Sequence, residues 1–151
     1  MTFEQFKNKY YQEILPNDHI DIRKGQSLMN FLSQVWFKQY KRMTSKFSDN
    51  VDCFYNDNLI PNALNHLQSN WYKFYEDIKK VYYVKSDMTK TDGNFTYPTG
   101  EREVVCYYVN NDEIVSLFDL NISITDNTEQ KIKEELKTLG FEEKNICLIK
   151  L

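Results

Sequence analysis

Few side chains in this sequence have the types and spacing that catalysis requires. The two histidines, His19 and His66, are the obvious candidates for a general base, and neither has a nucleophile or a metal ligand at a matching spacing. The sequence also lacks a nucleophile-elbow serine, a phosphate-binding loop, a dinucleotide-binding glycine motif and a zinc-protease helix motif. We therefore predict no catalytic residue and expect that the protein is not an enzyme.

Two groups of oxygen-bearing side chains invite comparison with a metal site. One lies within residues 49–57, and the other runs from Asp87 to Asn94 around Gly93. Neither has the spacing of a calcium-binding loop. A loop between helices explains the first group, and a hairpin turn at Asp92-Gly93 explains the second. We predict no metal and no cofactor.

Residues 36–47 interleave aromatic and basic side chains. The contact candidates in this segment are Trp36, Lys38, Tyr40, Lys41, Arg42 and Lys46. On a helix the four basic residues recur at spacings of three and four, so they form one ridge beside the rings. Such a ridge could hold a phosphate backbone or an acidic patch on a protein. A solvated helix face is the alternative interpretation.

Two tyrosine pairs, Tyr82-Tyr83 and Tyr107-Tyr108, lie in segments rich in valine. Because successive side chains of a strand point to opposite faces, each pair places one ring on either side of a sheet. The inward ring joins the core, and the outward ring could stack on a partner or anchor an interface. We take Tyr83 and Tyr107 as interaction candidates.

Charge and cysteine usage narrow the class of protein. The net charge of -3 argues against a dedicated nucleic-acid binder, and the acid surplus falls in residues 77–151, with 10 basic and 14 acidic residues. Cys53, Cys106 and Cys147 form no CxxC pair, so we expect no disulfide framework. No apolar stretch reaches the roughly 18 residues that span a bilayer. We expect a soluble protein in a reducing, cytoplasmic setting, without a membrane partner.

Apolar residues at spacings of three and four predict three helical segments in the first half of the chain. The first follows Thr2 as its cap and ends before Pro16. The second contains residues 28–35 and continues to Met43 after a kink. The third runs from Ile60 to Phe74.

The second half of the chain changes to the alternation that is typical of strands. Strands are predicted at 79–85, 103–109, 113–125 and 146–151, with a helix that Asp126 or Asn127 caps and Gly140 ends. We therefore predict an α+β fold. A helical subdomain, residues 1–76, would pack on a β-β-β-α-β subdomain with an antiparallel sheet, residues 77–151.

Three short motifs lie within the helical half. Their residues are Arg23, Gly25, Gln26 and Asn30 in an R-x-G-Q…N-x-L segment, Asp52 and Tyr55 in a D-x-F-Y segment, and the closing Trp71. The pattern covers roughly residues 3–75 and resembles short uncharacterised proteins that recur in phage and prophage genomes. The middle of the pattern lacks a proline expected at Trp36 to Lys38. The resemblance brings no activity and no catalytic residue with it.

The motif residues also have a physical interpretation of their own. Gly25 permits a tight entry into the second helix, and Gln26 and Ser27 offer caps for it. Arg23 and Asp52 could bridge the helix start to the following loop. These roles are architectural rather than catalytic.

Together these observations lead us to expect a phage or mobile-element accessory protein in the cytoplasm of a bacterial host. It would act by stoichiometric binding to a host or defence-system protein, or to a nucleoprotein complex. An inhibitor of a defence nuclease, similar to an anti-CRISPR protein, is the most concrete form of this hypothesis. The alternative is a small nucleic-acid-binding module that uses the basic-aromatic helix face.

Overall fold

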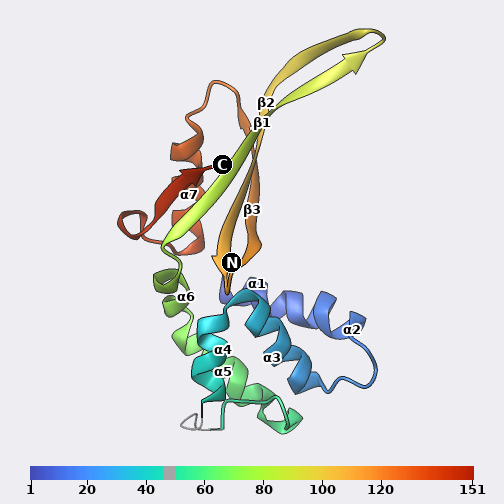
Figure 1. The fold of residues 1–151 in the computed structure, drawn as a ribbon, viewed down its shortest axis with the longest axis vertical. Coiled ribbons are helices and arrows are strands. Elements are labelled where there is room, and N and C mark those ends of the chain that lie inside the picture. The colour runs from blue at the N-terminus through green and yellow to red at the C-terminus, as the bar shows by residue number, and fades with distance from the viewer. Residues whose placement is uncertain (46–49) are drawn as a thin grey trace. The chain divides into compact units, whose positions relative to one another are not determined.

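The computed structural model describes residues 1–45 and 50–151, which divide into two compact units, Met1–Asp77 and Ile78–Leu151 (Figure 1). The first unit is helical, and the second is a four-stranded sheet with one helix. The fold is therefore α+β, as the sequence predicts.

The helical unit is built from short helices that follow one another closely. Their bounds are α1 (Phe3–Lys9), α2 (Leu15–Asn17), α3 (Lys24–Val35), α4 (Phe37–Thr44), α5 (Ile60–Asn70) and α6 (Tyr72–Asp77). Thr2 caps α1 through a capping box, because its hydroxyl accepts from the Gln5 N–H and the Gln5 side chain accepts from the Thr2 N–H. Trp36 has a non-helical backbone, with φ -148° and ψ 75°, that separates α3 from α4 at the predicted kink.

The prediction that the first helix ends before Pro16 is wrong, because the helix continues to Asn17. Residues Tyr10–Ile14 wind as a π-helical turn in which the Leu15 N–H donates to the Tyr10 carbonyl. This wider turn places Pro16 at the start of a new α-helical segment, where its missing N–H costs little.

A cluster of rings forms the core of the helical unit, with Trp71 at its centre. The centroid of the Trp71 ring lies 5.8 Å from Phe3, 5.2 Å from Phe6, 5.2 Å from Trp36 and 5.1 Å from Phe74. All five side chains are buried. Distances in this range suit the edge and offset contacts that aromatic rings prefer.

The second unit has the strand order β3-β2-β1-β4. Its elements are β1 (Lys80–Asp92), β2 (Phe95–Asn110), β3 (Glu113–Ser123), α7 (Thr128–Leu139) and β4 (Cys147–Lys150). The sheet is mixed, so the prediction of an antiparallel sheet is wrong for β4, which pairs with β1 in parallel. The reason is the crossover through α7, which returns the chain to the far edge in the direction of β1.

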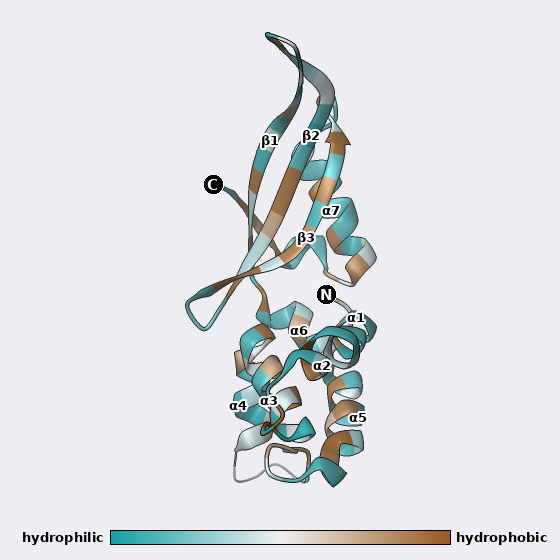
Figure 2. Cartoon of the chain, turned by 90° about the vertical axis from the view of Figure 1, so that its right-hand side faces the viewer, coloured by the Kyte–Doolittle hydropathy of each residue, from teal (hydrophilic) through white to brown (hydrophobic). Residues whose placement is uncertain are grey.

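One face of the sheet is covered by α7, as Figure 2 shows. The buried residues between sheet and helix include Val81 and Tyr83 of β1, Val104, Cys106 and Tyr108 of β2, and Ile132, Leu136 and Leu139 of α7. The Asn127 side chain caps the start of α7 and Gly140 ends it with φ 107°, as predicted. The opposite face, which we call the outer face, carries Tyr82, Val84, Tyr107 and Val109.

The hairpin of β1 and β2 is longer than predicted and extends beyond the end of β3 (Figure 1). Its turn is Gly93-Asn94, one residue later than expected, because Asp92 pairs with Phe95. A positive φ of 61° at Gly93 alone is typical of a type II′ turn. The register shifts after Asp87, so we define Met88–Glu101 as the arm.

Candidate functional site

The motif residues meet at the junction between the start of α3 and the loop that precedes α5. Asp57 accepts a hydrogen bond from the Gly25 N–H at 2.9 Å, and the Cys53 thiol donates to the Gly25 carbonyl at 3.5 Å. Burial raises the pKa of Cys53 to about 12, so the thiol keeps its proton at neutral pH. A Cβ atom at Gly25 would lie 2.0 Å from the Cys53 carbonyl oxygen. Only glycine permits this approach.

Arg23 and Tyr55 form the exposed part of this junction. The Arg23 Nε and Nη2 atoms donate to the Phe54 carbonyl at 3.4 Å and 3.2 Å, and the guanidinium lies 5.6 Å from the centre of the Tyr55 ring. The Tyr55 side chain is nevertheless 81% exposed. Tyrosine and arginine are the residue types that dominate binding energy at protein interfaces.

The loop that carries Tyr55 is held by its own side chains. Asp52 accepts from the Phe54 N–H at 3.0 Å, and Asn56 accepts from the Asn58 N–H at 3.0 Å. These are Asx turns, in which a short polar side chain fixes the backbone that follows it. The expected connection between the helix start and this loop is made by Arg23, which donates to the Phe54 carbonyl, whereas Asp52 contacts the Phe54 N–H within the loop.

The other motif residues have structural positions. Trp71 is the centre of the aromatic core, and Gln26 and Asn30 are half-buried on α3. Ser27 does not cap the helix, since its hydroxyl donates to Asp18. The motif therefore contains junction residues such as Gly25 and Asp52, the core residue Trp71, and the exposed pair Arg23 and Tyr55.

Two of the six contact candidates in the basic-aromatic segment, Trp36 and Arg42, form hydrogen bonds within the helical unit. Trp36 is 3% exposed, so its assignment as a contact residue is wrong. Asp77 accepts from the Trp36 indole at 2.7 Å and from Arg42 Nη1 and Nη2 at 2.9 Å and 3.1 Å. Burial alone would raise the pKa of Asp77, but the hydrogen bonds from Arg42 and Trp36 outweigh it and hold the pKa below its usual range.

The remaining candidates of this segment leave a smaller basic surface than expected. Lys38 and Lys41 are exposed on α4, and half-buried Tyr40 stacks on Phe37 with ring centres 5.8 Å apart. Lys46 lies outside the described residues. Among the described residues, the exposed lysines of this face are therefore Lys38 and Lys41.

The two tyrosine candidates lie on opposite faces of the sheet. Tyr107 is half-buried on the outer face, but Tyr83 is 4% exposed and its hydroxyl donates to Glu129 of α7 at 3.0 Å. The assignment of Tyr83 as a contact residue is therefore wrong, and Tyr82 is the outward member of its pair. The segment Val81 to Val84 reads V-Y-Y-V, so it contains no polar residue that could fix the faces in advance.

The outer face contains a small apolar hollow of about 130 Å³, which we call the hollow. Its lining consists of Tyr82, Tyr107, Val109, Ile114 and Leu151. The lining comes from β1, β2, β3 and the residue after β4, so sequence reasoning missed it. Register across the whole sheet would have been needed to find it.

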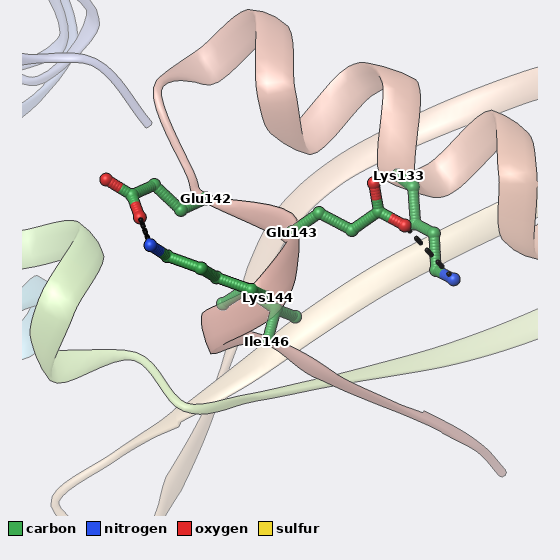
Figure 3. Close-up of a pocket in the computed structure, with 5 residues that line it drawn as sticks. All are labelled: Lys133, Glu142, Glu143, Lys144 and Ile146. Carbon is green, nitrogen blue, oxygen red and sulfur yellow. Dashed lines mark ion pairs between the residues drawn. The ribbon is translucent and has the colours of Figure 1, made fainter.

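A larger open pocket lies beside the end of α7 and is drawn in Figure 3. It measures about 510 Å³ and is lined by Lys133, Glu142, Glu143, Lys144 and Ile146. Its charges pair with one another, since Lys133 lies 3.4 Å from Glu143 and Lys144 lies 3.4 Å from Glu142. Paired surface charges of this kind offer little to a ligand.

The described residues contain no group of three or more histidine, cysteine or acidic side chains that could hold a metal ion. His19 Nδ1 lies 3.4 Å from a carboxylate oxygen of Asp21 at the surface, and His66 belongs to α5. Burial and the charge of Lys73 lower the pKa of His66, which favours its neutral form.

Within residues 1–45 and 50–151, no helix combines the length and apolar character needed to cross a membrane. Comparison of the chain with protein-family models, with curated proteins and with solved structures found no match.

Proposed function

We propose that the protein acts by stoichiometric binding to another protein, with Arg23 and Tyr55 at the centre of the contact. One observation carries this proposal. The Tyr55 ring is 81% exposed, yet the loop that bears it is fixed on α3 through Gly25, Cys53 and Asp57.

Exposure together with rigidity is the property that favours an interface. A side chain that is already held in position loses little conformational entropy when a partner covers it. Arg23 is held in the same way, since two of its nitrogens bond to the Phe54 carbonyl. Truncating a tyrosine or arginine at the centre of an interface costs about 2 kcal/mol or more.

We propose further that the partner is a host defence nuclease and that the protein inhibits it in the cytoplasm of a bacterial host, in the manner of an anti-CRISPR protein. The resemblance of the motif segment to phage and prophage proteins supports this choice. The unit Ile78–Leu151 adds support through its charge, with 10 basic and 13 acidic residues. A surplus of acid is complementary to the basic groove in which a nuclease holds its nucleic acid.

The test is a plaque assay in bacteria whose CRISPR nuclease targets the infecting phage. We expect the wild-type protein to restore plating, and the double variant Arg23→Ala, Tyr55→Ala to lose most of that effect. The matched control is Tyr72→Ala, because Tyr72 is 55% exposed and also has a cation, Lys73, 5.9 Å from its ring.

Binding to the purified nuclease gives the same comparison quantitatively. We expect the double variant to weaken binding by about 30-fold or more, while Tyr72→Ala binds as the wild type does. Equal binding by all three proteins would remove Arg23 and Tyr55 from the contact, and no restored plating with any defence nuclease would remove the inhibitor proposal.

Nucleic-acid binding is the second candidate function, carried by the exposed Lys38 and Lys41 beside the stacked rings of Phe37 and Tyr40. A gel-shift series in rising salt tests it. Binding at low salt that is lost in the variant Lys38→Glu, Lys41→Glu would support this function, and no binding at low salt would end it.

A further inference from the structure

We propose that two copies of this protein associate by exchanging arms, with Phe95 of each copy seated in the hollow of the other. The arm is residues Met88–Glu101, and the hollow is the apolar depression on the outer face. This inference concerns the unit Ile78–Leu151 and is independent of the proposed function, which rests on the helical unit.

The arm contacts the rest of its own unit at its end, where Glu101 pairs with Ser123 and the Gly100 carbonyl accepts from the Ile124 N–H, and the remainder of the ribbon extends beyond β3. Residues 89–101 are all exposed, and Phe95 and Tyr97 are 79% and 43% exposed. Because side chains alternate along a strand, these two rings share one face of the ribbon. The other face carries Thr91 and Thr96, whose hydroxyl oxygens lie 3.2 Å apart. A two-stranded ribbon is only marginally stable in water, so docking of its aromatic face would stabilise it.

The hollow has the size and chemistry of a site for one aromatic ring. Its volume is about 130 Å³, and an apolar protein cavity of about 150 Å³ binds benzene. The residues at its border are open to solvent, with Val109 49%, Ile114 71% and Leu151 63% exposed. A phenyl ring that enters the hollow covers these three side chains and is itself covered, so apolar surface of all four groups is removed from water.

Charges next to the two surfaces are complementary. Lys90 pairs with Tyr97 in the ribbon and Asp92 pairs with Phe95, so a base and an acid lie close to the rings. Lys80 lies two residues before Tyr82, and Asp119 pairs with Val105, two residues before Tyr107, so a base and an acid share the outer face with the hollow. Opposite charges at the rim of an interface favour one register over others.

The arm cannot reach the hollow of its own chain. Tyr82 in the hollow and Asp92 beside the turn lie on the same strand, ten residues apart, and a strand rises about 3.3 Å per residue. The tip of the arm is therefore about 33 Å from the hollow along a continuous ribbon. Phe95 can therefore fill such a hollow only on another molecule, and a second copy supplies an exposed Phe95 together with a second hollow.

An exchange between two copies is a closed arrangement. Each copy gives one arm and accepts one, so the same junction occurs twice about a two-fold axis and leaves neither hollow open. This arrangement predicts a dimer and no larger assembly.

The experiment is sedimentation equilibrium on the full chain and on three single variants. We expect the wild type to be dimeric. Phe95→Asp and Ile114→Asp, which place a charge in the two halves of the junction, should each raise the dimer dissociation constant by about 30-fold or more. Thr96→Asp is the matched control, because it adds the same charge to the opposite face of the arm and should leave the dimer intact. Circular dichroism checks that all variants fold.

Mixing the two defective variants makes the test specific for exchange. A heterodimer of Phe95→Asp with Ile114→Asp retains one complete junction, formed by the intact arm of the second and the intact hollow of the first. We expect the mixture to associate where neither variant does alone. A monomeric wild type, a dimer that survives either variant, disruption by Thr96→Asp, or a mixture that stays monomeric would each overturn the proposal.

Discussion

The helical unit and the sheet unit use the same abundant residue type, the aromatic side chain, in different ways. In Met1–Asp77 the rings around Trp71 are buried and contact one another directly. In Ile78–Leu151 the rings are divided, with Tyr83 inside the sheet-helix core and Phe95 exposed on the arm. An aromatic content of 15% therefore corresponds to a cluster of mutually contacting rings in one unit and to rings divided between core and surface in the other.

The two units also differ in how their distant segments are held together. The helical unit depends on single contacts between residues far apart in sequence, such as Gly25 with Asp57 and the Trp71 indole with the Met1 carbonyl. The sheet unit spreads its long-range contacts along ladders of backbone hydrogen bonds. We therefore expect one substitution to damage the helical unit more than the sheet unit.

The largest effect is expected from Trp71→Ala, which removes the centre of the aromatic core. The free energy of unfolding should fall by about 4 kcal/mol, because four neighbouring rings lose their contacts and a cavity remains. Trp36 is then the sole tryptophan and reports on this unit alone during urea denaturation followed by fluorescence. The control is Tyr72→Ala, the exposed neighbour in sequence. Equal midpoints for the two variants would contradict the role of the cluster.

Gly25→Ala should cost about 2 kcal/mol, since the new methyl group overlaps the Cys53 carbonyl oxygen and the loop has to move. Helix propensity alone has the opposite sign and would stabilise the helix by up to about 1 kcal/mol. Thermal unfolding decides between them, with Lys24→Ala as the exposed control on the same turn. A raised melting temperature for Gly25→Ala would show that the loop is not docked as described.

Asp77→Asn should lower the stability of the helical unit by about 1.5 kcal/mol at neutral pH, because the charge-assisted bonds from Arg42 are lost. The pKa of Asp77 is lowered in the folded state. Its contribution is therefore present above the unfolded value of about 4 and is lost as the pH falls through the folded value.

Urea denaturation midpoints measured at neutral pH and in acid, below about pH 4, test this dependence. The gap between the wild type and Asp77→Asn should narrow in acid, whereas Asp21→Asn at the surface should give little difference at either pH. A gap that stays constant on acidification would mean that the carboxylate charge of Asp77 contributes nothing.

The smallest effect belongs to the sheet unit. Tyr83→Phe removes the hydroxyl that donates to Glu129 and should cost about 1 kcal/mol. Both tryptophans lie in the other unit, so the measurement is hydrogen exchange of the β1 and β2 amides. Tyr107→Phe on the outer face is the control. A decrease in the free energy of unfolding as large as that of Trp71→Ala would show that the sheet unit also depends on single contacts.

Local signals in the sequence were enough to predict several elements of the fold. The Thr2 cap, the Asn127 cap and Gly140 follow from residue types at fixed positions, and each has the expected geometry. The direction of β4 could not be predicted, because it depends on how α7 crosses the sheet. The length of the arm was missed because residues 89–101 are exposed on both faces and so show no apolar alternation.

The candidate site was harder to predict than the elements. Gly25 was expected to permit a tight entry into the second helix. In the structure the Cys53 carbonyl oxygen lies 2.0 Å from where a Cβ atom of residue 25 would be. The exposure of Tyr55 and the burial of Trp36 depend on tertiary packing, which periodicity does not report. The hollow required the register of four strands, information that is absent from any one segment.

The parallel pairing of β4 with β1 has a kinetic consequence. The hairpins β1-β2 and β2-β3 close through two-residue turns, a process that takes about 1–10 μs. Lys80 and Cys147 pair although most of the unit's sequence lies between them. We therefore expect the β1-β4 ladder to form only after α7 has docked. Accordingly, we expect β4 to be the last strand to join during folding, and the edge of β1 to stay open to pairing with other chains until it does.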